Sequence, residues 1–186
     1  MEKLEQECGK MIDLCKKCFE LNGVGSFYCD ASKPDTHLTG YIEAYNEREL
    51  LIKHISKSGF YDGFILVQMS NLIRVDILGR YEKRIAALYA IRKQSHPRLN
   101  HLSDTLYDSM LDYARVNNLI ISVELENTLI SGFVLDFDEQ KLRIRVVDED
   151  GQVDGETIIL IEDTLCLAVD TDTEQNMKLL GEQGVN

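Results

Sequence analysis

The cysteines are the residues of this sequence whose types and spacing most readily suggest chemistry. Cys15 and Cys18 form a Cys-x-x-Cys pair, with Cys8 and Cys29 nearby, a pattern that can hold zinc or form a redox pair. The spacing differs from that of a zinc ribbon, and no strand–helix junction precedes the pair as in thioredoxin-like sites. A single helical stripe would instead contain Leu4, Cys8, Met11, Cys15, Cys18 and Phe19. We therefore expect buried, reduced thiols, with no metal and no cofactor.

The remaining motifs do not indicate catalysis. The four histidines are His37, His54, His96 and His101. None has a second metal-ligating residue at a spacing typical of metal sites, and we expect them to fill core or surface positions. The acidic runs "DEDG" and "DTDTE" lack the ligand pattern of a calcium-binding loop. The sequence contains no Walker loop, GxGxxG, GxSxG or HExxH motif. The chain is predicted not to be an enzyme and to have no catalytic residue.

One local feature favours nucleic acid, namely a basic segment between Asn71 and Asn100. Its cations are Arg74, Arg80, Lys83, Arg84, Arg92, Lys93 and Arg98, against only Asp76 and Glu82. Tyr81 and Tyr89 lie within it, and aromatic rings of this kind can stack on bases. The other interpretation is a solvated face of a linking helix that docks on the acidic second half of the chain. We favour this second interpretation and keep RNA as the alternative partner.

Length and charge suggest two small domains, a near-neutral one followed by an acidic one. The 186 residues suit two domains of about 90. Residues 1–100 have a net charge of +2 and residues 101–186 a net charge of −14, and so acidic a half repels phosphate. No apolar run approaches the roughly 18 residues that span a bilayer, and "MEKLEQECGKMIDL" is too charged for a signal peptide. We expect a cytoplasmic protein without membrane contact.

An internal repeat gives the architecture. A shift of 92 positions aligns residues 39–88 with 131–180 without a gap and with nine identities in fifty positions. Continued upstream, the same shift places "LCKKCFEL" on "LYDSMLDY", so that Cys15, Cys18 and Cys29 match Tyr107, Met110 and Ile121. Each unit then consists of a helix, five strands and a closing helix, at "RYEKRIAAL" or "DTEQNMKLL". The predicted domains are residues 1–95 and 96–186, joined at "KQSHPRLNHLS", where His96-Pro97 breaks a helix and Ser103 can cap the next.

The repeat includes a glycine-containing turn and an alternating strand. The turn glycines are Gly59, Gly63, Gly151 and Gly155; the first of each pair should supply positive φ at the loop tip, and the following Asp-Gly should close the return into strand four. The run "KLRIRVV" should place Lys141, Arg143 and Arg145 on one face and Leu142, Ile144 and Val146 on the other.

A helix followed by five short strands is the plan of the Sm-like small β-barrels. "GFVLDFDEQKLRIRVVDEDG" resembles the first Sm motif and "DGETIILIEDTLCLAV" resembles the second. The resemblance implies an α+β protein that is mainly β with flanking helices: two tandem Sm-like or SH3-like five-stranded barrels, each preceded by a helix. The "DG..DG" tracts followed by "YEKRI..L" also resemble uncharacterised proteins of low-GC Gram-positive bacteria.

The RNA contacts of Sm proteins do not carry over to this sequence. The Sm turn that binds a base normally has an Asn after a Met, whereas here the turns are Asp138-Glu139-Gln140-Lys141 and Asn46-Glu47-Arg48-Glu49. "IEDT" and "MSNL" replace the Arg-Gly that follows strand four. What the resemblance implies beyond the fold is assembly, because Sm barrels pair strand four with a neighbour's strand five.

We therefore expect a non-enzymatic module for protein–protein interaction or self-association. Strand four, "GFILVQM" or "ETIILI", is rich in aliphatic residues and should form an edge that must be covered. The two units should pair with each other, with further dimerisation through the remaining edge. Ile65 is predicted to lie at this edge, so that its replacement by Lys would loosen the pairing.

Overall fold

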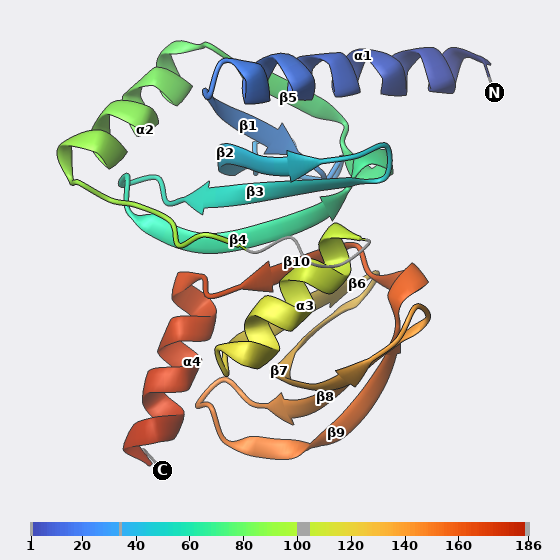
Figure 1. The fold of residues 1–186 in the computed structure, drawn as a ribbon, viewed down its shortest axis with the longest axis vertical. Coiled ribbons are helices and arrows are strands. Elements are labelled where there is room, and N and C mark those ends of the chain that lie inside the picture. The colour runs from blue at the N-terminus through green and yellow to red at the C-terminus, as the bar shows by residue number, and fades with distance from the viewer. Residues whose placement is uncertain (1, 34, 100–104, 185–186) are drawn as a thin grey trace. The chain divides into compact units, whose positions relative to one another are not determined.

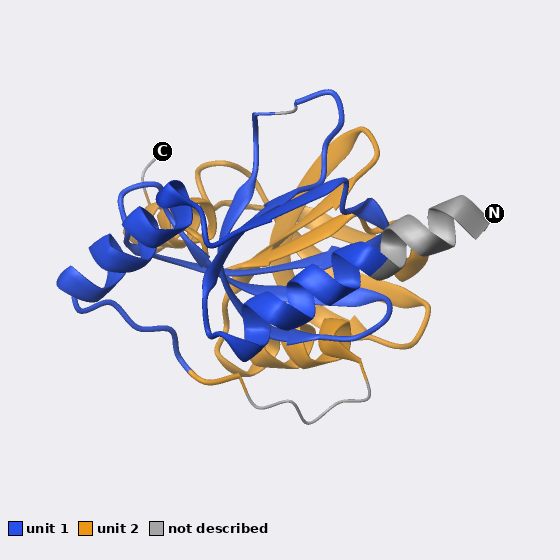
Figure 2. Ribbon diagram, turned by 90° about the horizontal axis from the view of Figure 1, so that it is seen from above, with its two compact units in different colours: residues 1–97 blue, residues 98–186 orange. Residues whose placement is uncertain are grey.

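A computed structural model describes residues 2–33, 35–99 and 105–184, with side chains from residue 10 onward. The chain divides into two compact units, residues 1–97 and 98–186 (Figure 2). Each unit combines helices with antiparallel strands (Figure 1), which confirms the α+β expectation. No helix in the described part of the chain is both long enough and apolar enough to cross a bilayer.

Unit 1 consists of a first helix, five strands with a short 3-10 turn, and a closing helix. Its sheet has the order β5-β1-β2-β3-β4, with every pairing antiparallel. The elements are α1 (Glu2–Glu20), β1 (Val24–Tyr28), β2 (Leu38–Tyr45), β3 (Glu49–Ile55), β4 (Tyr61–Gln68), η1 (Met69–Asn71), β5 (Arg74–Ile77) and α2 (Arg80–Ile91).

Unit 2 repeats this arrangement. Its sheet has the order β10-β6-β7-β8-β9, again antiparallel. The elements are α3 (Leu106–Val116), β6 (Ile120–Leu125), β7 (Thr128–Phe137), β8 (Lys141–Val147), β9 (Val153–Leu160), η2 (Ile161–Asp163), β10 (Cys166–Val169) and α4 (Asp172–Gln183). The N-cap of α3 is Thr105, whose hydroxyl accepts a hydrogen bond from the Asp108 amide; the predicted cap, Ser103, lies outside the described residues.

The predicted spacing of 92 residues is confirmed from β3 to the closing helix. Every element bound from Glu49 to Ile91 recurs 92 positions later. Irregularities recur as well: β2 and β3 shift register between Ile42 and Ala44, and β7 and β8 do so between Val134 and Asp136. The spacing of 92 residues stays constant over this stretch because each bulge and turn of one unit has a counterpart of the same length in the other.

Upstream of β2 the prediction is wrong by four residues. The helix–strand junctions match at a spacing of 96: the Gly23 amide donates to the Cys18 carbonyl at 3.0 Å, and the Leu119 amide donates to the Ala114 carbonyl at 2.9 Å. The cause is the connection between the first two strands, which spans residues 29–37 in unit 1 and only 126–127 in unit 2. Three of these seven extra residues are offset because β6 and β7 are longer than β1 and β2 by one and two residues, which leaves a net shift of four. Cys15 and Cys18 therefore correspond to Leu111 and Ala114.

The four turn glycines all have positive φ, but they act in two different places. Gly63 (φ 67°) and Gly155 (φ 86°) lie inside β4 and β9, which begin two residues before each of them. There they accompany a register shift in the pairing with the third strand, which is the position of a bulge. The predicted start of strand four after this Asp-Gly pair is therefore wrong.

The other two glycines hold the loop against the closing helix. A Cβ atom on Gly151 would lie 1.9 Å from the Met177 carbonyl oxygen of α4, and one on Gly59 would lie 2.4 Å from Leu88 Cβ of α2. Only glycine permits so close an approach. The loop thus fixes the distance from the sheet to the closing helix in both units.

The bulge in β8 changes the predicted alternation at one residue. Leu142 and Ile144 are buried while Lys141, Arg143 and Arg145 are exposed, as the pattern indicates. The register shift between Arg145 and Val147 then rotates the strand, so that Val147 rather than Val146 is buried.

Candidate functional site

The structure divides the basic segment among several positions. Arg74 lies on β5, where it pairs with Asp76 and covers the Tyr28 ring at 4.4 Å. Arg92 follows α2, donates to the Ser58 carbonyl at 2.9 Å and covers Phe60. Lys93 has positive φ at the helix end, and Arg98 belongs to the chain after unit 1.

Three cations of the segment share one exposed turn of α2. These residues, the α2 basic face, are Arg80, Lys83 and Arg84. No acidic side chain in the described ranges forms an ion pair with any of them. The positions that correspond to them on α4 are Asp172, Gln175 and Asn176, so the basic face is a property of unit 1 alone.

The two tyrosines of the segment are not free to stack on bases. Tyr89 is buried in a core cluster with Val24, Ile55 and Ile85, and burial raises its pKa to about 12. Tyr81 is half-buried and packs against the same cluster. The packing of these two rings therefore gives no support to the base stacking that the RNA alternative would use.

Tyr81 instead belongs to a row of rings and cations in unit 1. The row runs Arg74, Tyr28, His37, Tyr81, Arg84, with ring centroids 4.9 Å apart between Tyr28 and His37 and 5.1 Å apart between His37 and Tyr81. The Arg84 guanidinium lies 5.5 Å from the Tyr81 ring centre. His37 comes from the long connection between β1 and β2, which unit 2 lacks.

His96 is not the isolated residue that its sequence context indicated. Its Nε2 lies 2.9 Å from the His54 carbonyl oxygen and 3.1 Å from the Gly63 carbonyl oxygen, so Nε2 carries the hydrogen and donates to both. Nδ1 then accepts the Tyr89 hydroxyl hydrogen at 2.7 Å. Burial lowers the His96 pKa to about 4, which keeps the ring neutral.

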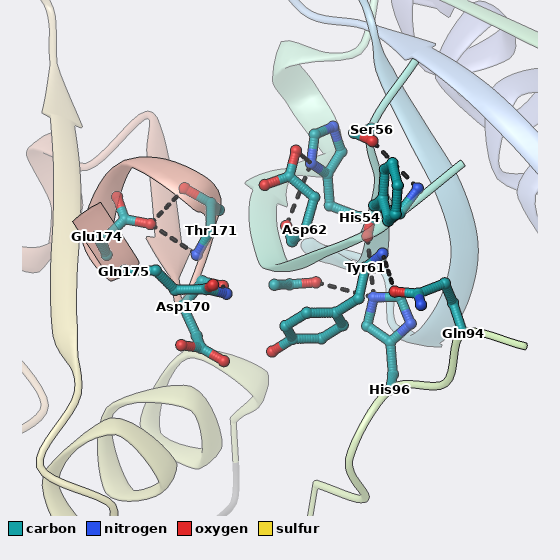
Figure 3. Close-up of polar contacts among 12 residues, drawn as sticks. His54, Ser56, Tyr61, Asp62, Gln94, His96, Asp170, Thr171, Glu174 and Gln175 are labelled. Carbon is teal, nitrogen blue, oxygen red and sulfur yellow. Dashed lines mark hydrogen bonds and ion pairs between the residues drawn. The ribbon is translucent and has the colours of Figure 1, made fainter. Parts of the chain in front are cut away.

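These bonds attach the segment after α2 to the bulge of β4 (Figure 3). The Tyr61 ring packs on His96 with a centroid distance of 4.7 Å, and the Tyr61 amide donates to the Gln94 side chain at 3.1 Å. His54 also has a partner, because its Nδ1 lies 3.0 Å from an Asp62 carboxylate oxygen. His101 lies outside the described residues.

A buried serine–glutamate pair fastens the closing helix to the first strand in each unit. The Ser26 hydroxyl donates to Glu82 at 2.6 Å, and the Ser122 hydroxyl donates to Glu174. Glu174 also accepts hydrogen bonds from the Thr171 amide and hydroxyl in a capping box (Figure 3). Buried carboxylates of this kind are tolerated because donors and the helix N-terminus compensate them.

The spacing of 92 residues aligns the two glutamates but not the two serines. Glu82 and Glu174 are 92 residues apart, whereas Ser26 and Ser122 are 96 apart. A search that permitted one gap before β2 would have found the pair. Its geometry is that of a structural fastening rather than of an acid–base site, since both partners are buried.

The Cys-x-x-Cys pair faces the interior of unit 1. Cys15 and Cys18 are buried free thiols, and burial raises their pKa values to about 12 and about 11. Their counterparts Leu111 and Ala114 are apolar and buried as well. Among the described residues, no group of three or more His, Cys, Asp or Glu side chains has a geometry that would hold a metal ion.

The chain was compared with protein family models, curated proteins and solved structures. None of them matches it. The resemblance to the Sm-like proteins therefore rests on the motifs, strand order and repeat of this chain itself.

The two fourth strands differ in exposure. β9 is the last strand of its sheet in the described part of the chain, and Ile158 and Leu160 on it are 62% and 43% exposed. In β4 the corresponding Leu66 is buried. Ile65 is also buried and lies opposite Ile52 of β3; its role in pairing of the two units stays a prediction.

Proposed function

We propose that the chain is a non-enzymatic interaction module of two Sm-like barrel units that self-associates through the edges of its sheets. Support for the barrel comes from the strand order within each unit, in which the fifth strand pairs with the first. The bulges in the second and fourth strands also support it, because bulges bend strands toward closure.

The exposure of β9 carries the proposal. An edge strand with exposed aliphatic side chains is a template for strand addition, and proteins usually cover or charge such an edge. Ile158 and Leu160 are exposed on β9. At one end of the unit 1 strand order, β5 is flanked by Ile73 and Leu78, which are also exposed. Pairing of β9 from one copy with β5 of the next would cover both sets of side chains.

Sedimentation velocity over a range of protein concentrations tests this proposal. The wild-type chain should form dimers or larger species at tens of micromolar. A double variant, Ile158→Lys with Leu160→Lys, should require about tenfold more protein to associate. The reason is that removing water from two lysine ammonium groups at a strand edge costs free energy.

The control is Ile91→Lys, which replaces a still more exposed aliphatic residue on α2 and should associate like the wild type. A wild-type chain that is monomeric at every concentration would contradict the proposal. So would a loss of association in the Ile91 variant equal to that in the β9 variant.

A second candidate function is RNA binding, which the unpaired α2 basic face supports. Replacement of Arg80, Lys83 and Arg84 by Glu should then abolish binding to single-stranded RNA, and the salt dependence should correspond to roughly three phosphate contacts. The control is Arg145→Glu, an exposed cation of unit 2. RNA binding that survives the triple substitution would exclude this surface.

Pairing of the two units with each other stays a prediction. If fragments 1–95 and 96–186 are each soluble and have no affinity for one another, that prediction fails while self-association of the full chain can still hold.

A further inference from the structure

In unit 1 the chain that follows α2 lies on the bulge of β4 and binds to its backbone (Figure 3). His96 Nε2 donates to the carbonyls of His54 and Gly63 at 2.9 and 3.1 Å. The His96 ring also packs on Tyr61 and Phe64, with centroid distances of 4.7 and 5.4 Å. A non-helical segment thus binds the bulge through one side chain that donates to two backbone carbonyls. Carbonyls are present whatever the side chains are, so a second copy of the bulge offers the same acceptors.

Unit 2 contains this second copy, at the start of β9. The loop before the strand closes through the same two backbone hydrogen bonds in both units, 92 residues apart. The third and fourth strands shift register at equivalent positions, and Gly155 (φ 86°) repeats the positive φ of Gly63 (67°). The carbonyls of Val146 and Gly155 therefore correspond to those of His54 and Gly63.

The bulge of β9 is open where the bulge of β4 is covered. In the described part of the chain, no side chain donates a hydrogen bond to the carbonyl of Val146 or Gly155. Residues 153–156 are all exposed, whereas their counterparts, residues 61–64, are half-buried or buried. A Cβ atom on Gly155 would meet no atom within 4 Å. The acceptors that His96 uses in unit 1 are therefore accessible in unit 2.

The carboxylate of this bulge also lacks the partner that it has in unit 1. There, Asp62 pairs with His54 Nδ1 at 3.0 Å. Val146 stands at the position of His54 in unit 2, and Asp154 at that of Asp62. Asp154 is exposed and forms no ion pair within the described ranges, which leaves it for a cation of a ligand.

The loop beside the bulge adds further negative charge. Glu149 and Asp150 are exposed and have no ion-pair partner among the described residues. Arg145 is also exposed near the bulge, but it lies opposite Glu156, so these two charges offset each other. The segment that covers the bulge in unit 1 is itself basic, since residues 92–98 read "RKQSHPR". Charge complementarity thus favours a basic ligand in unit 2 as well.

We propose that the bulge of β9 is a docking site for an extended basic segment of a partner protein, bound as residues 92–97 are bound on the bulge of β4. A side chain of the partner with an N–H group takes the place of His96 and donates to the carbonyls of Val146 and Gly155. A neighbouring cation pairs with Asp154. The occupant is not the same segment of a second copy, because His96 of each copy is already bound in its own unit 1. The site does not depend on the self-association proposed above.

Fluorescence anisotropy of the full chain with a labelled peptide RKQSHPR, the sequence of residues 92–98, tests the site. Saturable binding in the micromolar range is expected at low ionic strength. A peptide with His96→Phe should bind about fivefold more weakly because it lacks the N–H donor, whereas one with His96→Gln keeps a donor and should stay within about twofold. The chain variant Asp154→Lys should bind the parent peptide about tenfold more weakly, because a repulsion replaces an ion pair.

The matched control is Glu139→Lys, which makes the same charge change at an exposed position in the turn at the other end of β8. It should bind the peptide like the wild type, and an equal loss in both variants would reduce the binding to general attraction by an acidic unit. Hydrogen exchange should show added protection in residues 147–156 and none in residues 55–64, where protection would mean that the peptide displaces the segment of unit 1.

Three results would overturn the proposal: no saturable binding, wild-type affinity in Asp154→Lys, or added protection in unit 1 instead of unit 2. If the peptide binds in unit 2 and also dissociates self-associated wild-type chain, the occupant is the corresponding segment of a second copy, and the assignment to a partner protein is wrong. Since Asp154 is exposed, Asp154→Lys should unfold at the same temperature as the wild type, so that its loss of binding reports on the site.

Discussion

Acidification should loosen unit 1 through His96, well before the carboxylates of the protein are protonated. The unfolded chain has a His96 pKa near the ordinary 6.5, and the folded chain has one of about 4. Between these values the unfolded state binds more protons than the folded state, so the stability of unit 1 falls as the pH decreases through this window. Protonation adds a hydrogen to Nδ1, which then can no longer accept from the Tyr89 hydroxyl.

The size of the effect follows from the two pKa values. From pH 7 to about pH 4.5, proton linkage predicts a loss of roughly 2 kcal/mol, allowing for the part of the ring that solvent reaches. Asp30, Asp76 and Asp138 have pKa values lowered by their hydrogen bonds, so their stabilisation is lost only below about pH 4. The window above pH 4.5 therefore reports mainly on histidine.

Hydrogen exchange of the full chain is the appropriate assay, because it resolves the two units. Protection factors of unit 1 amides, including that of Tyr61, which bonds to Gln94, should fall about thirtyfold between pH 7 and pH 4.5. Amides of unit 2 serve as the internal reference.

The matched variant is His96→Gln, whose side-chain amide can donate to the same carbonyls but does not titrate in this range. It should be less stable at pH 7 and should show a much smaller loss on acidification. Equal pH dependence of the variant and the wild type would refute the reasoning.

Three further predictions concern packing and reactivity. Gly151→Ala should lower the free energy of unfolding of unit 2 by about 3 kcal/mol or more, since the new Cβ meets the Met177 carbonyl oxygen at 1.9 Å. Gly155→Ala places its Cβ in open space at φ 86° and should cost only about 1–2 kcal/mol. Urea unfolding of the two variants measures this difference. Ser122→Ala should cost about 1–3 kcal/mol in the same assay, because Glu174 loses a buried donor; no measurable change would contradict the fastening role. Cys15 and Cys18 should react with iodoacetamide far more slowly than the partly exposed Cys29, because burial raises their pKa values and blocks access, and mass spectrometry of the native protein would show equal labelling if this is wrong.

The sequence predicted the repeated half of each unit well because identical glycines and glutamates mark it. Gly59 and Gly151, or Glu82 and Glu174, are constrained by contacts that recur in both units. The first helix had no such marker, since Cys15 and Leu111 share only their burial, and the serines of the first strands, Ser26 and Ser122, match only when a gap is allowed. An ungapped alignment therefore continued past the point where the two connections differ in length.

The contacts of the histidines could not be predicted from the sequence for a different reason. His96 bonds to the backbone carbonyls of His54 and Gly63, and a carbonyl leaves no trace in the sequence. The row through His37 likewise depends on a connection whose path only the fold defines. The composition did indicate a cluster of cations near α2. These cations are close in sequence but do not form a single surface, since Arg74 and Arg92 have partners of their own.

The unequal connection between the first two strands marks the part of each unit whose length can change without changing the sheet. From the second strand onward, each unit is held to one length by bulges, close glycine contacts and the serine–glutamate fastening, and an inserted residue there would displace all of them. Residues 29–37 and 126–127 join the same two strands with nine residues in one unit and two in the other, and both sheets keep the same order. This connection is thus the place where a copied unit can acquire a new loop without rebuilding its core, and in unit 1 the longer version brings in His37.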